Sequence, residues 1–246
     1  MDLAQAFWYA WPWMGLGMAV PMLVLLFATG LQRGSDAPRW RDPYWLAWAA
    51  MPAYLVHQFE EYGLNIIDGN YVIIEQVFAN AGGILDLSGL PMFHFPLVNV
   101  ALVWAGVPLA AWLGRRMRNP VVALSPYGFV LVNGLMHLGL TLARGVPVAD
   151  NPGFFTGVFL FLPLVALVIA VCARGSFMRG GGIAAFLAAG AVAHVLLGVG
   201  YAVSALGPAA VAALDVFAGL SPAVLAWLFC KAFKVRCGDG IVRNAR

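Results

Sequence analysis

Charged residues are scarce in this chain of 246 residues. Asp, Glu, Lys and Arg together make up 10% of it, whereas soluble domains carry about 25%. Hydrophobic residues make up 62%, and the mean hydropathy is +0.85. This shortage of charge excludes a water-soluble globular protein. It predicts an all-α integral membrane protein, because a helix satisfies its own backbone hydrogen bonds in lipid.

Long apolar runs take the place of the missing charge. A helix that crosses a bilayer needs about 20 consecutive and mainly apolar residues. By this criterion we expect seven transmembrane helices in a single domain that covers residues 1–246, without internal repeats. The expected helices cover residues 11–31, 44–61, 92–113, 124–142, 154–172, 183–206 and 209–233.

Basic residues lie almost entirely on one side of these helices. Of the 14 Lys and Arg residues, Arg144 alone falls in a connection on the opposite side. Because short cytoplasmic loops carry the positive charge, the N-terminus is expected outside and the basic tail at residues 234–246 in the cytoplasm. Trp8, Trp11 and Trp13 are expected in an aromatic belt at the membrane surface. The excess of Arg over Lys is typical of high-GC bacteria and favours a bacterial plasma membrane.

The net positive charge is small. A formal charge of +3 and an isoelectric point near 8.9 reflect cytoplasmic Arg and Lys that face anionic headgroups. Membrane lipids are therefore the expected partners and nucleic acid is not, while the sequence does not indicate an oligomeric state. Three cysteines, all near predicted cytoplasmic helix ends where thiols stay reduced, do not favour a disulfide framework.

Glutamate is rare, yet Glu60 and Glu61 are adjacent at the predicted outer end of helix 44–61. His57 precedes them by three and four residues, so the three side chains share one helix face. A His and a carboxylate one turn apart can converge on a metal ion, and the second carboxylate can then act as a general base. The alternative is a helix end that meets water, with these side chains among the headgroups.

The four histidines lie in four different predicted helices. His94 begins helix 92–113, and His137 follows Asn133 by one turn in the outer half of helix 124–142. Both are expected at the depth of His57, whereas His194 lies near mid-membrane and is expected to be a packing residue. The predicted metal ligands are His57, Glu60, His94 and His137, and the predicted catalytic residues are Glu60, Glu61 and Asn133.

Three short signatures follow one another along the chain: His57-x-x-Glu60-Glu61, Asn133-x-x-x-His137, and Asn151-Pro152-Gly153 in the next predicted outer loop. In order and spacing they resemble the HXXEE-domain family, polytopic membrane proteins of unassigned activity, over residues 44–172. The third signature of that family is usually Tyr-x-Pro-Gly. Asp150 stands at the position of the Tyr, which weakens the case for a tyrosine hydroxyl there.

Two or three histidines with a carboxylate are the ligand set of a catalytic zinc ion with an open position. We therefore expect a membrane enzyme that performs metal-assisted hydrolysis on an apolar or lipid-like substrate near the outer leaflet. Zinc is the preferred divalent metal. A di-iron centre ranks lower, because the known carboxylate type uses four carboxylates and two histidines.

Two other classes of function stay open. A metal-free isomerase or a terpene-cyclase-like enzyme would use Glu60 or Glu61 together with Asp215, the only acid in the last three predicted helices. An ion or proton transporter would use the same His and Glu side chains to coordinate its cargo. Against a transporter stand the lack of repeats and the confinement of polar groups to the outer half.

Residues 62–91 form a predicted extracytoplasmic segment at the membrane surface. Tyr71, Ile74 and Phe78 recur at helical spacing and predict an interfacial helix. This segment links the His57 motif to His94. It is therefore expected to be either a plain connector or a lid over a cavity.

Overall fold

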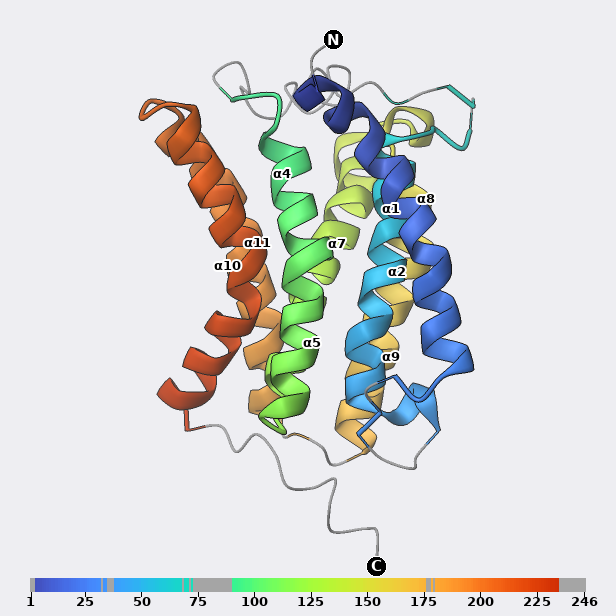
Figure 1. Ribbon diagram of the computed structural model, residues 1–246, viewed down its shortest axis with the longest axis vertical. Helices are drawn as coiled ribbons and strands as arrows, with labels where there is room; N and C mark the ends of the chain where they lie inside the picture. Colours follow the sequence, from blue (N-terminus) through green and yellow to red (C-terminus); the bar gives the residue numbers. More distant parts are fainter. Residues whose placement is uncertain are drawn as a thin grey trace, which may run out of the picture.

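The computed structural model describes residues 3–234 except 32, 35–37, 68, 71, 73–89, 176–177 and 179. The protein is all-helical, with 82% helix and no strand in the described part of the chain. The interfacial helix predicted around Tyr71 and Phe78 and almost all of the basic tail lie outside the described residues. Figure 1 shows the long helices packed along one common direction.

Helices cover all seven segments that the sequence predicts. Two of them contain a π-helical stretch, η2 and η4, and such stretches are frequent at functional sites. The elements are α1 (Leu3–Ala28), the 3₁₀ turn η1 (Arg39–Arg41), α2 (Pro43–Tyr62), α4 (His94–Val100), η2 (Ala101–Gly106), α5 (Val107–Arg116), α6 (Pro120–Ala123), α7 (Pro126–Arg144), the 3₁₀ turn η3 (Val148–Asp150), α8 (Phe154–Thr156), η4 (Gly157–Phe161), α9 (Leu162–Arg174), α10 (Gly180–Ser204) and α11 (Pro208–Ala232).

Six helices in the described residues are long and apolar enough to cross a membrane, which makes this a membrane protein. The number of seven spans and the orientation in the membrane stay predictions. The six helices cover Ala6–Ala28, His94–Arg116, Pro120–Arg144, Phe154–Arg174, Gly180–Gly200 and Pro208–Ala232.

Helix α2 is the remaining predicted span. It begins where the Asp42 carboxylate accepts the backbone N–H groups of Tyr44 and Trp45, at 2.9 and 3.3 Å. Its 20 residues extend over about 30 Å, the thickness of the hydrocarbon core. Most of its side chains are buried, and the helix packs against α1, α5, α7 and α9. Because protein surrounds α2, the helix can carry polar side chains away from lipid. These side chains make it less apolar than the six helices named above.

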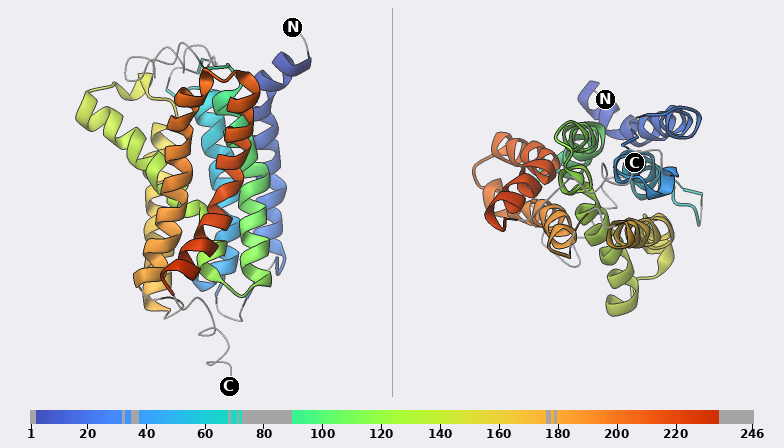
Figure 2. Two further views of the ribbon diagram at one scale, coloured as in Figure 1. Left: turned by 90° about the vertical axis from the view of Figure 1, so that its left-hand side faces the viewer. Right: turned by 90° about the horizontal axis from the view of Figure 1, so that it is seen from below.

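Glycines allow the helices to touch at their backbones. Gly128 of α7 faces Gly190 of α10, and a Cβ atom added at Gly128 would stand 2.9 Å from the Gly190 Cα. Gly219 of α11 packs in the same way against η2, since a Cβ atom added there would stand 2.6 Å from the Leu102 nitrogen. Membrane helices associate through such close packing, since lipid provides little hydrophobic drive. As a result α10 and α11 form one edge of the bundle, opposite α1 and α2 (Figure 2).

Candidate metal centre

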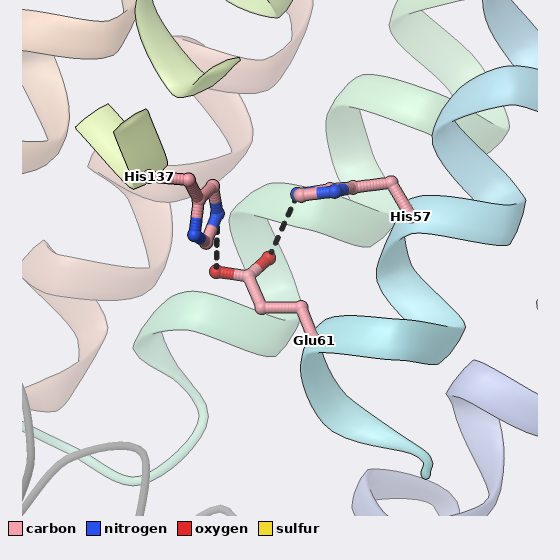
Figure 3. Close-up of side chains that lie close together, drawn as sticks. All are labelled: His57, Glu61 and His137. Atoms are coloured by element: carbon pink, nitrogen blue, oxygen red, sulfur yellow. Dashed lines mark ion pairs between the residues drawn. The ribbon is translucent and has the colours of Figure 1, made fainter. Parts of the chain in front are cut away.

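Side chains from the first two signatures meet near the end of the bundle at which α1 begins. His57 and Glu61 come from the last two turns of α2, and His137 comes from α7. Glu61 lies between the two rings, with Oε2 3.4 Å from His57 Nε2 and Oε1 3.8 Å from His137 Nε2 (Figure 3). One ligand atom of each residue lies within 4.8 Å of the others. Within the described chain, no other group of three or more His, Cys, Asp or Glu side chains could hold a metal ion.

This group is shielded from solvent. His57 and His137 are buried, and the Glu61 side chain is 14% exposed. His57 Nε2 and Glu61 Oε2 face each other, and neither has a hydrogen-bond partner among the described residues. Buried polar atoms are normally hydrogen-bonded, so an unsatisfied pair of this kind needs an explanation. Ligand atoms on one zinc ion lie about 3–4 Å apart, given zinc–nitrogen bonds of about 2.0–2.1 Å, and the observed spacing fits such an ion.

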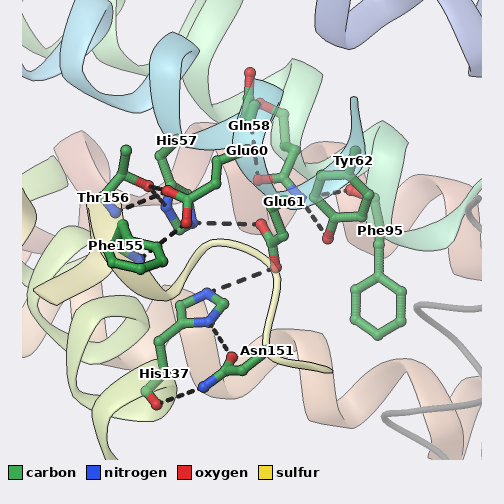
Figure 4. Close-up of polar contacts among 11 residues, drawn as sticks. His57, Gln58, Glu60, Glu61, Tyr62, Phe95, His137, Asn151, Phe155 and Thr156 are labelled. Atoms are coloured by element: carbon green, nitrogen blue, oxygen red, sulfur yellow. Dashed lines mark hydrogen bonds and ion pairs between the residues drawn. The ribbon is translucent and has the colours of Figure 1, made fainter. Parts of the chain in front are cut away.

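A hydrogen-bonded chain orients the His57 ring. Thr156 Oγ1 lies 2.7 Å from His57 Nδ1, and the same hydroxyl donates its hydrogen to the Glu60 carboxylate (Figure 4). Since that hydrogen is committed to Glu60, the hydroxyl oxygen accepts from the Nδ1–H of His57. The lone pair of the ring is therefore on Nε2, which faces Glu61. Metal-binding histidines usually donate their other N–H to a protein acceptor in this way.

Asn151 orients the His137 ring by the same principle. Its Nδ2 donates to the backbone oxygen of His137 at 2.8 Å (Figure 4). It also donates to Thr141 Oγ1 at 3.0 Å, and the two bonds fix the direction of the amide. The Asn151 Oδ1 then lies 2.8 Å from His137 Nδ1 and accepts its hydrogen. His137 therefore also presents an unprotonated Nε2 to Glu61.

Gly153 brings the third signature against both rings. Its φ of +89° is in the left-handed region that favours glycine. A Cβ atom at this position would stand 2.8 Å from His137 Cε1 and 2.9 Å from His57 Cε1. The Asn-Pro-Gly segment thus provides an acceptor for one imidazole and a backbone without a side chain beside both. All three signatures converge on one site.

The structure separates the roles of the two adjacent glutamates. Glu60, predicted as a ligand, instead accepts the backbone N–H groups of Phe155 and Thr156 at 2.9 and 2.7 Å, in addition to the Thr156 hydroxyl. Its carboxylate thus holds the N-terminus of α8, where unpaired N–H groups and the helix dipole favour a negative charge. Residues 100° apart on a helix face different neighbours. Glu61 therefore faces both histidines, and Glu60 supports His57 through Thr156.

His94 does not join this group, which corrects its prediction as a ligand. Its Nδ1 lies 2.8 Å from Asp215 Oδ1 on α11, and both side chains are buried. Depth along the membrane was the basis of the prediction, but depth does not fix the direction in which a side chain leaves its helix. The same contact occupies Asp215, which therefore does not pair with Glu60 or Glu61.

Asn133 and His194 differ in their relation to the site. The Asn133 side chain is buried and interacts with the His57 ring, which it approaches from α7. His194 lies outside the group and packs against the Phe129 ring, with ring centres 4.6 Å apart. Thr156 was not predicted from the sequence. The sequence feature that could have identified Thr156 is its position in the first helical turn after Asn-Pro-Gly.

Thr156→Val should weaken metal binding about 10- to 100-fold, the usual cost of losing a group that orients a metal ligand. The substitution keeps the shape of the side chain but removes the acceptor for His57 Nδ1–H. Zinc affinity can be measured by competition with a chromophoric chelator. Thr29→Val is the matched control, because Thr29 Oγ1 bonds only within its own exposed segment. Equal zinc affinities in Thr156→Val and the unmodified protein would contradict the role of Thr156.

Comparison with known proteins agrees with this site. Residues 48–168 match a family model described as "Protein of unknown function with HXXEE motif". No curated protein and no solved structure matches the chain. The matched segment contains His57, Glu61 and His137 together with the groups that orient them. Through residues 48–168, the chain therefore belongs to the family of proteins of unknown function with an HXXEE motif.

Proposed function

We propose that this protein is a membrane-embedded metal enzyme, with a centre held by His57, Glu61 and His137. One observation carries the proposal: both imidazoles use Nδ1 for a protein acceptor and direct Nε2 toward the same carboxylate. An ion pair between Glu61 and a histidine would need only one imidazole that faces the carboxylate, whereas here two do so. Two rings fixed in the same tautomer around one carboxylate are the arrangement expected of metal ligands.

Zinc is the metal that this set of ligands fits best. Two His and one carboxylate, with a fourth position left to water or substrate, are a ligand set of catalytic zinc. A dinuclear iron centre needs more carboxylates than are available, because Glu60 is bound to α8 and His94 is paired with Asp215. A mononuclear centre therefore has the better support.

Hydrolysis is the proposed reaction. A bound zinc ion polarises a carbonyl or phosphoryl oxygen and lowers the pKa of bound water. Glu60 is not free to act as a base, because both of its oxygens accept hydrogen bonds from α8. Asn133, which is buried beside His57, is a polar group that could orient water or substrate.

The proposed substrate is apolar or lipid-like. The centre is buried in a bundle whose helices expose apolar side chains such as Phe159 and Leu142. A substrate that is dissolved in the membrane can reach such a centre without crossing water. The positive-inside prediction places this end of the bundle on the extracytoplasmic side, so the substrate is proposed to arrive from the outer leaflet. The metal-free alternative loses support, since it required Asp215 beside the glutamates.

Metal analysis of the purified protein tests the proposal. We expect about one zinc ion per chain by mass spectrometry, together with hydrolysis of chromogenic fatty-acyl esters that stops on chelation and returns with zinc. Glu61→Gln, which removes the negative charge but keeps the size, should lower both zinc content and hydrolysis. A protein that neither copurifies with metal nor binds added zinc would refute the metal centre. Zinc binding without hydrolysis across a panel of esters, amides and phosphoesters would refute only the hydrolytic assignment.

A further inference from the structure

Tyr54 lies on the face of α2 that carries the metal centre. Positions 54, 57 and 61 are related by steps of three and four residues, so their side chains follow one another along one face of the helix. The Tyr54 side chain is fully buried. Its hydroxyl has no hydrogen-bond partner among the described residues. A polar group without a partner is thus placed one turn from a ligand.

The Tyr54 ring packs against the His57 ring and so lies beside the centre. The two rings meet edge to face, with centres 5.6 Å apart and planes at 85°. Phe161 packs against both rings, at 4.9 Å from Tyr54 and 4.3 Å from His57. Tyr54 also lies close enough to the Glu61 carboxylate to interact with it electrostatically. The Tyr54 side chain therefore contacts one of the three residues of the centre and lies within electrostatic range of a second.

Packing alone does not explain a tyrosine at this position. Phe129 and Phe161 fill the same aromatic cluster without a hydroxyl. A buried hydroxyl without a partner costs about 1–3 kcal/mol, and buried tyrosines usually find an acceptor. Tyr127 shows the usual case, since it is equally buried and donates to the Leu46 carbonyl at 2.6 Å. The acceptor for Tyr54 is therefore expected to be a bound molecule.

We propose that Tyr54 donates a hydrogen bond to an oxygen atom of the molecule at the open position of the metal centre. This inference rests on the proposed function. It narrows the class of substrate to molecules that bind the metal through an oxygen atom, such as a carboxylic ester, an amide or a carboxylate. The metal would draw electrons from that oxygen, and the phenol would stabilise the negative charge that gathers there. Tyr54 is thus a binding group for the reacting oxygen.

Cobalt-substituted protein with acetate as the probe tests this role. Cobalt(II) gives visible absorption bands that shift when an anion binds at the metal, so acetate affinity can be read by titration. Tyr54→Phe removes one oxygen atom and should weaken acetate binding about tenfold or more, as expected for a hydrogen bond to a charged group. Its cobalt affinity should stay unchanged, since Tyr54 is not a ligand.

Tyr127→Phe is the matched control, because it removes an equally buried hydroxyl that already has a partner. It should lower the thermal midpoint of the metal-free protein, since the Leu46 carbonyl loses its donor, and leave acetate affinity unchanged. Tyr54→Phe should show the opposite pattern, without thermal loss. Equal acetate affinity in Tyr54→Phe and the unmodified protein would overturn the role of Tyr54 while the metal centre stands. Failure of the unmodified protein to bind cobalt would instead refute the centre itself.

Discussion

Replacing either His57 or His137 by alanine is expected to remove bound metal almost completely. In the proposed centre each residue supplies one of three ligands, and the remaining two would not hold an ion against a competing chelator. Metal content should fall from about one ion per chain to background by mass spectrometry. The helical content by circular dichroism should be retained, because the changes remove ligands and leave the helix contacts in place.

Two other histidines provide the controls for this experiment. His194→Ala and His94→Ala should both keep their metal, because His194 packs against Phe129 and His94 is paired with Asp215. The same measurement applies to all four variants. If His194→Ala lost metal as fully as His57→Ala, the centre would lie deeper in the bundle than the His57, Glu61 and His137 group. A dinuclear centre that uses all four histidines would then be the better account.

Asp215→Ala is expected to destabilise the bundle by about 3–5 kcal/mol, because it leaves a buried partner without its counter-group. The His94–Asp215 contact joins α4 to α11 away from the metal ligands, with both side chains buried. Thermal or denaturant unfolding in detergent measures the loss. Metal content should remain at the level of the unmodified protein, which separates this contact from the centre.

A double variant tests whether the loss of stability in Asp215→Ala comes from the unpaired His94 side chain. Replacing both His94 and Asp215 by apolar residues of similar volume should restore most of the lost stability, since exchange of a whole buried pair is often close to neutral. If the double variant were as unstable as the sum of the single ones, the two side chains would act independently. The contact at 2.8 Å would then contribute little to holding α11.

The sequence was sufficient to predict the helices of this fold. Length and apolarity place a helix at every expected segment, because a bilayer leaves few alternatives for the backbone. Helix α2 was found by the same pattern, although its polar side chains set it apart from the six apolar helices. Trp11 was expected in the aromatic belt at the membrane surface, and its depth in the membrane stays a prediction. It is fully buried, with its ring 5.2 Å from that of Tyr62.

The site was only partly predictable, because spacing gives the depth and the face of a residue but not its neighbours. The structure brings His57 and His137 together, as the similar depth of their motifs led us to expect, and their role as metal ligands stays a prediction. The choice between Glu60 and Glu61 depends on where α8 begins relative to α2, a contact between residues that are 95 positions apart. Neither the partner of His94 nor the donors around Glu60 can be read from local sequence.

The chain order of the site has a consequence for biosynthesis. The ligands lie on α2 and α7, and the groups that orient them lie between Asn151 and Thr156. Helices α10 and α11, which form the other edge of the bundle, follow later in the chain. Every group of the centre has therefore been synthesised before the first residue of α10. A metal ion at the proposed centre could thus meet its full ligand set on a nascent protein, before the last two helices pack onto the bundle.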